Sequence, residues 1–225
     1  MQITHSAVSP WKHLVMGALT FFLLAVAIGM VFLYAPTEIT MGDAQRILYL
    51  HVSVTWCGLA ACLTMGACSA GYMIRRNLVL DYWSQASTEV ACLCFTITLV
   101  SGSLWAHEAW SVWWTWEPRL TSALVLWLIL AGICLARASI DDLRTRARVS
   151  GGLAVLAMID LPILIMATRW FRGIHPVAPQ MDPRMRFVLL AAIVAFTVFF
   201  ALLIWQRRSQ IDLAARVLTV ERMGG

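Results

Sequence analysis

Long apolar runs alternate with short polar segments along the whole chain. Six of these runs approach or exceed the about 20 residues that a helix needs to cross the hydrocarbon core of a bilayer. They cover residues 14–34, 48–74, 89–105, 120–135, 149–168 and 187–205. The pattern predicts an all-α fold, a polytopic membrane bundle of six transmembrane helices.

The composition supports this prediction. Hydrophobic residues make up 60% of the 225 residues, charged residues only 13%, and the mean hydropathy is +0.76. Such a chain has too little polar surface to cover a soluble globule. Because no low-complexity linker or repeat divides it, residues 1–225 are expected to form a single integral-membrane domain, with the first apolar run retained as an anchor.

Positive charges collect in alternate connections. Eleven of the 17 Lys and Arg residues fall on one predicted side, which we expect to be cytoplasmic and to hold both termini. The other side receives the connections 35–47, 106–119 and 169–186. The net charge of +5 is then explained by orientation and by attraction to membrane lipid, with no need for a nucleic acid partner.

Several kinds of chemistry are missing from the sequence. The six cysteines lie inside predicted spans and form no Cys-x-x-Cys pair, so neither a zinc site nor a thioredoxin-type motif is indicated. Without Cys-x-x-Cys-His the chain does not itself carry a covalent c-type haem. Without a Walker sequence, any ATP-driven step must belong to another subunit.

Five of the 11 tryptophans lie in residues 105–121, between two apolar runs. If residues 110–117 are helical, Trp110, Trp113, Trp114 and Glu117 share one face, and Pro118 begins the next span. We therefore expect an amphipathic outer-face segment, a helix lying on the membrane surface. An interfacial aromatic belt is the alternative, but the concentration of rings favours a binding surface.

Three of the five histidines, His51, His107 and His175, are predicted on this same face. Imidazole is a strong ligand of haem iron, and two histidines can take opposite axial positions. We expect His51 and His175 to be the iron ligands, with His107 as an alternate or accessory ligand. Asp160, within the fifth span, is expected to serve helix packing rather than a proton relay.

The outer arginines have two interpretations: they snorkel at helix ends, or they bind anionic groups. A haem has two propionates that need charge-assisted partners, and the planar fork of arginine suits carboxylates. Arg119, which ends the tryptophan segment, is the leading candidate. Weaker candidates are Arg46, Arg184 and Arg186.

Three motifs carry a family resemblance. The stretch WSVWWTWEPRLTS at 110–122 resembles the tryptophan-rich "WWD" signature of haem-handling proteins, most closely that of the cytochrome c maturation protein C family. The stretches RILYLHV at 46–52 and WFRGIH at 170–175 resemble that family's two histidine motifs. Glu117, Ser111 and Ser53 stand where the family usually has aspartate, glycine and proline.

The resemblance implies that the chain binds haem b non-covalently at the outer face of the bacterial inner membrane through His51 and His175. The haem is expected to lie against Trp110, Trp113, Trp114 and Trp116, with Glu117 and Arg119 beside it. In that family the haem is passed to a periplasmic haem chaperone. An ABC-type ATPase with its membrane subunit and a small single-span subunit are the further partners.

We therefore expect a haem-binding delivery subunit without enzymatic activity. The alternatives are a cytochrome b-like quinol oxidoreductase subunit, a cytochrome c haem lyase, and a haem-free scaffold anchored by its tryptophans. The oxidoreductase is less favoured because histidine pairs for electron transfer commonly lie deeper in a bundle. The lyases are generally larger than this chain.

Overall fold

The computed structural model describes residues 10–171, 173 and 181–224, and these residues contain six long α-helices. A π-helical turn at Met30–Tyr34 ends the first, and a 3-10 turn at Asp43–Arg46 precedes the second. The helices are α1 (Pro10–Gly29), α2 (Ile47–Arg75), α3 (Leu78–Trp110), α4 (Pro118–Ser139), α5 (Leu143–Trp170) and α6 (Pro183–Gly224).

These helices confirm the predicted all-α fold of six candidate spans. In the described part of the chain, all six are long and apolar enough to cross a membrane. The main differences lie in α3, which begins 11 residues before the predicted span, and in α6, which continues to Gly224. The added part of α3 is a mixed stretch that contains Asp81, and the added part of α6 is rich in charged residues, so neither continues the apolar run. In α6, i,i+4 ion pairs from Asp212 to Arg208 and Arg216 support the extension.

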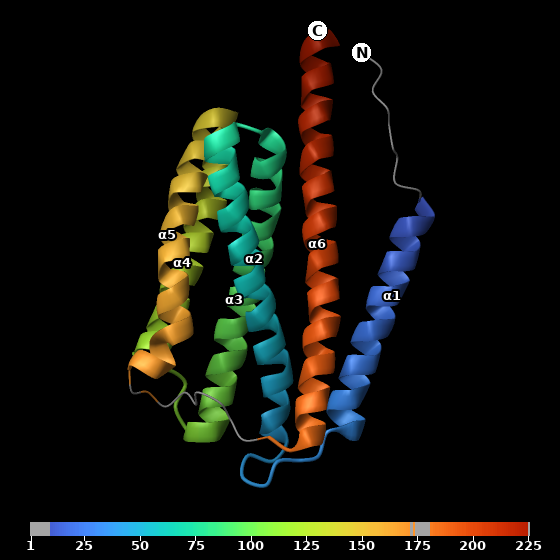
Figure 1. The fold of residues 1–225 in the computed structure, drawn as a ribbon, viewed down its shortest axis with the longest axis vertical. Coiled ribbons are helices and arrows are strands. Elements are labelled where there is room, and N and C mark those ends of the chain that lie inside the picture. The colour runs from blue at the N-terminus through green and yellow to red at the C-terminus, as the bar shows by residue number, and fades with distance from the viewer. Residues whose placement is uncertain (1–9, 172, 174–180, 225) are drawn as a thin grey trace.

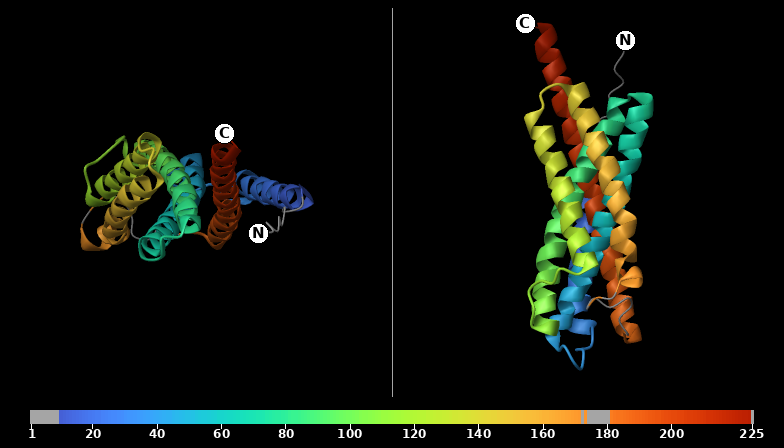
Figure 2. Two further views of the ribbon diagram at one scale, coloured as in Figure 1. Left: turned by 90° about the horizontal axis from the view of Figure 1, so that it is seen from above. Right: turned by 90° about the vertical axis from the view of Figure 1, so that its left-hand side faces the viewer.

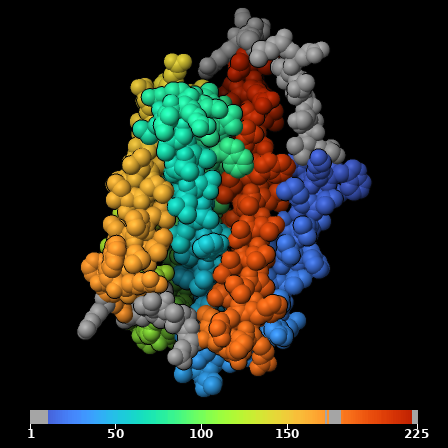
Figure 3. Space-filling model, in the orientation of Figure 1, coloured from blue at the N-terminus to red at the C-terminus, as the bar shows by residue number. Residues whose placement is uncertain are grey.

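The helices form an elongated row rather than a round bundle (Figures 1 and 2). The pair α4 and α5 packs against α2 and α3, α6 lies across the other side of α2 and α3, and α1 lies outermost against α6. In the space-filling view the surface of α6 is flanked by α2 and α1 (Figure 3). The main core is shared by α2 to α6 and includes Val54, Met65, Phe95, Leu126 and Leu130.

Successive connections lie at opposite ends of the bundle (Figure 1). One end of the bundle holds residues 35–46 and 111–117, the C-terminal end of α5 and the N-terminal end of α6. We call it the tryptophan end. The other end, which holds residues 76–77 and 140–142 and the C-terminal part of α6, is called the arginine end. The described parts of the three predicted outer connections thus gather at one end, as expected.

The tryptophan segment is not the surface helix that we expected at 110–117. Trp110 belongs to the last turn of α3, and Ser111 ends that helix in a left-handed conformation with φ 57°. Glu117 is extended, with φ −68° and ψ 154°, because Pro118 disfavours helical backbone in the residue before it. Residues 111–117 therefore form an irregular loop, and α4 begins at Pro118.

Candidate functional site

A small pocket of ≈ 80 Å³ opens beneath the tryptophan loop. We call it the His51 pocket. Its walls come from α2, α3, the start of α4 and the outer part of α5, so four helices and the loop enclose it. Apolar side chains form most of the lining. The polar and aromatic side chains among its lining residues are His51, Thr55, Phe95, Thr98, Ser103, Trp105, Trp110, Trp114 and Arg119.

The imidazole of His51 is held by α3. Its Nδ1 lies 3.0 Å from Oγ of Ser101, and Ser101 also donates to the carbonyl of Ile97 at 2.6 Å. The ring packs directly on the backbone of Gly102, where a Cβ atom would lie 2.9 Å from Cε1 of His51. Glycine at this position thus makes room for the ring. With Nδ1 engaged by Ser101, Nε2 is the nitrogen through which this histidine would bind a metal ion.

The tryptophans divide into two groups. Trp105 and Trp110 pack together with ring centroids 5.2 Å apart, and both line the His51 pocket with Trp114. Trp113 and Trp116 face outward, with exposed fractions of 55% and 75%. In a segment that is not helical, successive rings can point to opposite sides. Trp110 and Trp114 therefore face the pocket, whereas Trp113, which we expected on the same face, points outward.

Arg119 brings a cation to the pocket from the first turn of α4. It is half-buried, and no carboxylate in the described part of the chain lies within ion-pair distance of it. A partly desolvated arginine is stabilised when its donors find an anionic or carbonyl partner. The guanidinium is therefore suited to hold an anionic group of a ligand.

Glu117 lies against the connection that follows α5. A Cβ atom on Gly173 would overlap Oε2 of Glu117, so the glutamate side chain packs directly on this backbone. The tryptophan loop and the connection between α5 and α6 are therefore in contact. His175, the second expected iron ligand, lies outside the described residues, and so does Arg172.

The other candidates lie outside the pocket lining. His107 stacks on the exposed Trp113 with ring centroids 4.1 Å apart and an interplanar angle of 22°, and its Nδ1 lies 3.4 Å from Glu108. Arg46 binds Asp43 and the carbonyl of Val31, so it ties two turns of the chain together. Arg184 pairs with Asp182, and Arg186 also begins α6 rather than lining the pocket.

Sequence reasoning missed the three residues of α3 that shape the site, Ser101, Gly102 and Ser103. Ser103 donates to the backbone carbonyl of Trp113 at 2.6 Å and so fixes the tryptophan loop to α3. The signal was available, because Ser-Gly-Ser is a small, polar break in an otherwise apolar span. The Ser-Gly-Ser stretch points to a binding site only once the structure shows that His51 packs on Gly102.

Asp160 joins two helices, as expected. Its Oδ1 accepts a hydrogen bond of 2.9 Å from Ser122 and so links α5 to α4. Ser122 directly precedes Ala123, which lines the His51 pocket. The bond therefore fixes the relative position of two pocket walls.

These features define a class: a polytopic helical membrane protein with a tryptophan-lined pocket at one end, whose described lining includes His51 and the half-buried Arg119. The family model described as Heme exporter protein C matches residues 3–222. Because this match covers nearly the whole chain, the chain belongs to the heme exporter protein C family.

Curated relatives agree with this assignment. Heme exporter protein C of Bradyrhizobium diazoefficiens is 29% identical over 203 residues, 87% of this chain and 75% of the relative. Heme exporter protein C of Escherichia coli K12 is 29% identical over 178 residues, 77% and 73% of the two chains. A putative cytochrome c biosynthesis ccmC-like mitochondrial protein of Marchantia polymorpha is 27% identical over 154 residues, 68% and 65%.

Proposed function

We propose that this chain is a haem-binding membrane subunit of cytochrome c maturation. It holds haem b non-covalently at the tryptophan end and delivers it to a periplasmic haem chaperone. The observation that carries the proposal is the His51 pocket, where an imidazole, three indoles and a half-buried arginine converge beneath one loop. Membership in the heme exporter protein C family supports haem as the ligand of this pocket.

The chemistry of the pocket fits a haem. Imidazole binds haem iron, indole rings stack on a flat macrocycle, and arginine pairs with a propionate. His51, the inward tryptophans and Arg119 supply these three groups from different elements. Trp113 and Trp116 form an exposed edge beside the pocket, where a haem could be reached by a partner protein.

His175 remains the proposed second axial ligand. It follows Gly173 by two residues, and the contact between Gly173 and Glu117 supports the placement of this connection beside the tryptophan loop. Glu117 would hold the two connections together at the edge of the site. We propose that the carboxylate of Glu117 contacts the chaperone or positions the tryptophan loop, and that it does not bind iron.

The tryptophan end is proposed to face the periplasm and the arginine end the cytoplasm of a bacterial inner membrane. This orientation follows the excess of Lys and Arg at the arginine end and places both termini in the cytoplasm. The whole chain of 1–225 would then act as one integral-membrane domain.

The chain is proposed to act without bond-making chemistry of its own. Delivery then needs partners: the periplasmic chaperone as acceptor, an ABC-type ATPase with its membrane subunit as the source of energy, and a small single-span subunit. Lipid surrounds the bundle, and no nucleic acid takes part. The quinol oxidoreductase alternative has less support, because in the described residues no histidine lies at the middle of a span.

Haem content of purified variants tests this function. The full chain, purified in detergent, is expected to carry b-type haem with the visible spectrum of a six-coordinate iron. His51→Ala should lose most of this haem, because the pocket loses its only described imidazole. His175→Ala should change the spectrum in the same direction.

His107→Ala is the matched control, since His107 lies at the same end but stacks on Trp113 outside the pocket. It should retain haem. Equal haem content and an identical resonance Raman spectrum in His51→Ala and the unmodified chain would refute the assignment.

A further inference from the structure

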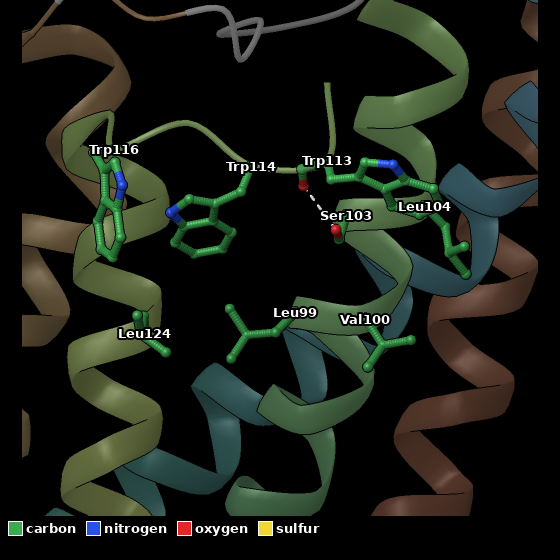
Figure 4. A pocket seen from close by; sticks show the side chains of 8 residues that line it. All are labelled: Leu99, Val100, Ser103, Leu104, Trp113, Trp114, Trp116 and Leu124. Carbon is green, nitrogen blue, oxygen red and sulfur yellow. Dashed lines mark hydrogen bonds between the residues drawn. The ribbon is translucent and has the colours of Figure 1, made fainter. Parts of the chain in front are cut away.

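A second, larger hollow lies beside the His51 pocket. It is a groove of ≈ 560 Å³ between α3 and α4, roofed by the tryptophan loop (Figure 4). Its walls are Leu99, Val100 and Leu104 of α3 and Leu124 of α4, and three indoles close its upper part. Unlike the His51 pocket, it has no charged residue in its lining.

The groove faces the lipid side of the bundle. Val100 and Leu104 on its α3 wall are exposed, and so is Leu128 one turn deeper on α4. Leu99 lies 11 residues before the end of α3, which corresponds to a depth of roughly 16 Å at about 1.5 Å per residue. The groove is thus an apolar slot within the leaflet at the tryptophan end.

The two hollows share a wall. Leu99, Ser103 and Trp114 line both the groove and the His51 pocket. Figure 4 shows the Trp114 indole hanging from the loop between the two helices, above Leu99. His51 and Arg119 lie on the far side of this wall, since they line the pocket and not the groove.

Size requires the wall to move. Pockets for ligands of drug size measure about 300–1,000 Å³, and the ≈ 80 Å³ of the His51 pocket falls well below that range. The groove alone falls within it. A porphyrin that is to reach His51 therefore needs more space than the pocket has, and the adjoining groove supplies that space once the wall between them moves.

Trp114 is the part of the wall that can move at the smallest cost. Its Nε1 has no hydrogen-bond partner among the described residues, and its ring contact is the edge of the exposed Trp116. Its backbone lies in the irregular loop, whereas Trp105 and Trp110 are fixed on α3 and pack on each other. Rotating the Trp114 indole breaks no hydrogen bond of that side chain.

We propose that the groove is the lateral portal through which haem dissolved in the lipid leaflet reaches the His51 pocket, with the Trp114 indole as its gate. This rests on the proposed haem-binding function. The apolar groove admits the macrocycle but offers no ligand for iron or propionate. His51 and Arg119 beyond the gate supply both, so the haem is retained only after passage.

Loading kinetics test the portal. Apo protein is reconstituted in phosphatidylethanolamine and phosphatidylglycerol vesicles, haem is added to the lipid, and the bound-haem Soret band is followed in time. Leu124→Trp fills the groove from α4 and should slow loading by at least about tenfold relative to the unmodified chain. The haem content at saturation should stay unchanged, because Leu124 does not line the pocket.

Leu128→Trp is the matched control, with the same substitution one turn deeper on an exposed position outside the groove. It should load at the unmodified rate. Val100→Trp fills the opposite wall and replaces Leu124→Trp if that variant does not fold. Trp114→Ala opens the gate and should both load haem and release it to apomyoglobin faster.

The outcomes separate the two proposals. Normal haem binding with equal loading rates in the groove-filled and control variants would overturn the portal and leave the haem site intact; the groove would then be ordinary lipid-facing surface. A lower saturating content in Leu124→Trp at an unchanged rate would also overturn it, since the groove would be part of the resting site. Absence of haem from the unmodified chain would overturn the proposed function instead.

Discussion

The two ends of the bundle use their polar residues in opposite ways. At the arginine end, the buried Arg137 of α4 binds the buried Asp81 of α3, with Nη2 and Oδ1 2.6 Å apart. Gln85 lies 3.4 Å from the same guanidinium, and Glu89 pairs with Arg207 of α6. Charged groups of three helices thus pair with one another.

At the tryptophan end, the corresponding groups point into a hollow. Arg119 has no carboxylate within ion-pair distance in the described part of the chain, and His51 lines a pocket with indoles instead of acids. Arg137 is buried and Arg119 is half-buried, and both belong to the 22-residue helix α4. Of these two arginines, only Arg137 has a carboxylate partner among the described residues.

The difference teaches how a helical bundle separates stability from binding. A buried ion pair is costly to break, whereas we propose that the half-buried Arg119 is available to a ligand. Substitutions at the arginine end should therefore change the stability of the protein and leave the haem affinity of the folded molecules unchanged. Substitutions at the tryptophan end should do the reverse.

The largest expected effect is that of Asp81→Ala. It leaves Arg137 buried without its carboxylate, and breaking a buried ion pair in this way costs about 3–5 kcal/mol. The thermal midpoint in detergent should fall strongly, while the haem affinity of the folded fraction stays the same. Asp43→Ala, which breaks an exposed pair with Arg46, is the control and should change the midpoint little.

Restoring the balance sharpens this test. The double variant Asp81→Leu with Arg137→Leu removes both charges and should recover most of the lost stability. If the double variant is no more stable than Asp81→Ala, the ion pair is not the source of the loss.

Gly102→Ala should act on binding. The added Cβ forces the His51 ring to shift, since overlap in a packed site costs roughly 1–3 kcal/mol. We expect haem affinity to fall by about tenfold or more, with a changed resonance Raman signature of the iron–imidazole bond. Gly132→Ala on α4 is the matched control, because a Cβ there meets nothing within 4 Å. Equal haem titration curves for the two variants would argue against His51 as a ligand.

Ser103→Ala should have an intermediate effect. It removes the hydrogen bond to the Trp113 carbonyl, a bond worth about 1 kcal/mol. The loop should then become more mobile, and acrylamide should quench the tryptophan fluorescence more strongly. Ser209→Ala, which removes a serine bond to the carbonyl of Trp205 within α6, should leave the quenching unchanged.

The hydropathy pattern was enough to predict the six spans and the gathering of three connections at one end. Both follow from local composition. The bilayer thickness sets the length of each apolar run, and successive spans place every second connection at the same end of the bundle. The helix ends could not be predicted equally well. α3 begins at Leu78 in a mixed stretch where Asp81 pairs with Arg137, and α6 continues to Gly224 through residues that form i,i+4 ion pairs. Hydropathy does not register such pairing.

Residue type was enough to choose residues that line one pocket, but not to predict the shape of that pocket, and haem binding there stays a prediction. His51, Trp110, Trp114 and Arg119 do line one pocket, which their sequence separation alone could not guarantee. The prediction of a surface helix at 110–117 was wrong. It applied helical spacing to residues on both sides of Ser111, but the left-handed backbone of Ser111 ends the helix there. The packing of His51 on Gly102 joins α2 to α3 and has no local signal.

The smallest expected effects come from two exposed carboxylates in the connections, one at each end. Hydrogen bonds from the Thr145 side chain and backbone lower the pKa of Asp142 below its usual value, as that carboxylate begins α5. At the tryptophan end, the Thr40 hydroxyl and the Met41 amide lower the pKa of Glu38 in the same way. The contrast between the two ends should vanish here, because neither group is buried.

A lowered folded-state pKa stabilises the protein above the unfolded pKa of about 4, and this stability is lost as pH falls through the folded value. The thermal midpoint of the unmodified chain should exceed those of Asp142→Asn and Glu38→Gln slightly at pH 6. Each difference should shrink as pH falls from about 5 toward 3. A difference in thermal midpoint that grows on acidification would show that the folded protein favours the neutral carboxyl. A much larger difference at one end would show that the two connections differ in stability as the two ends of the bundle do.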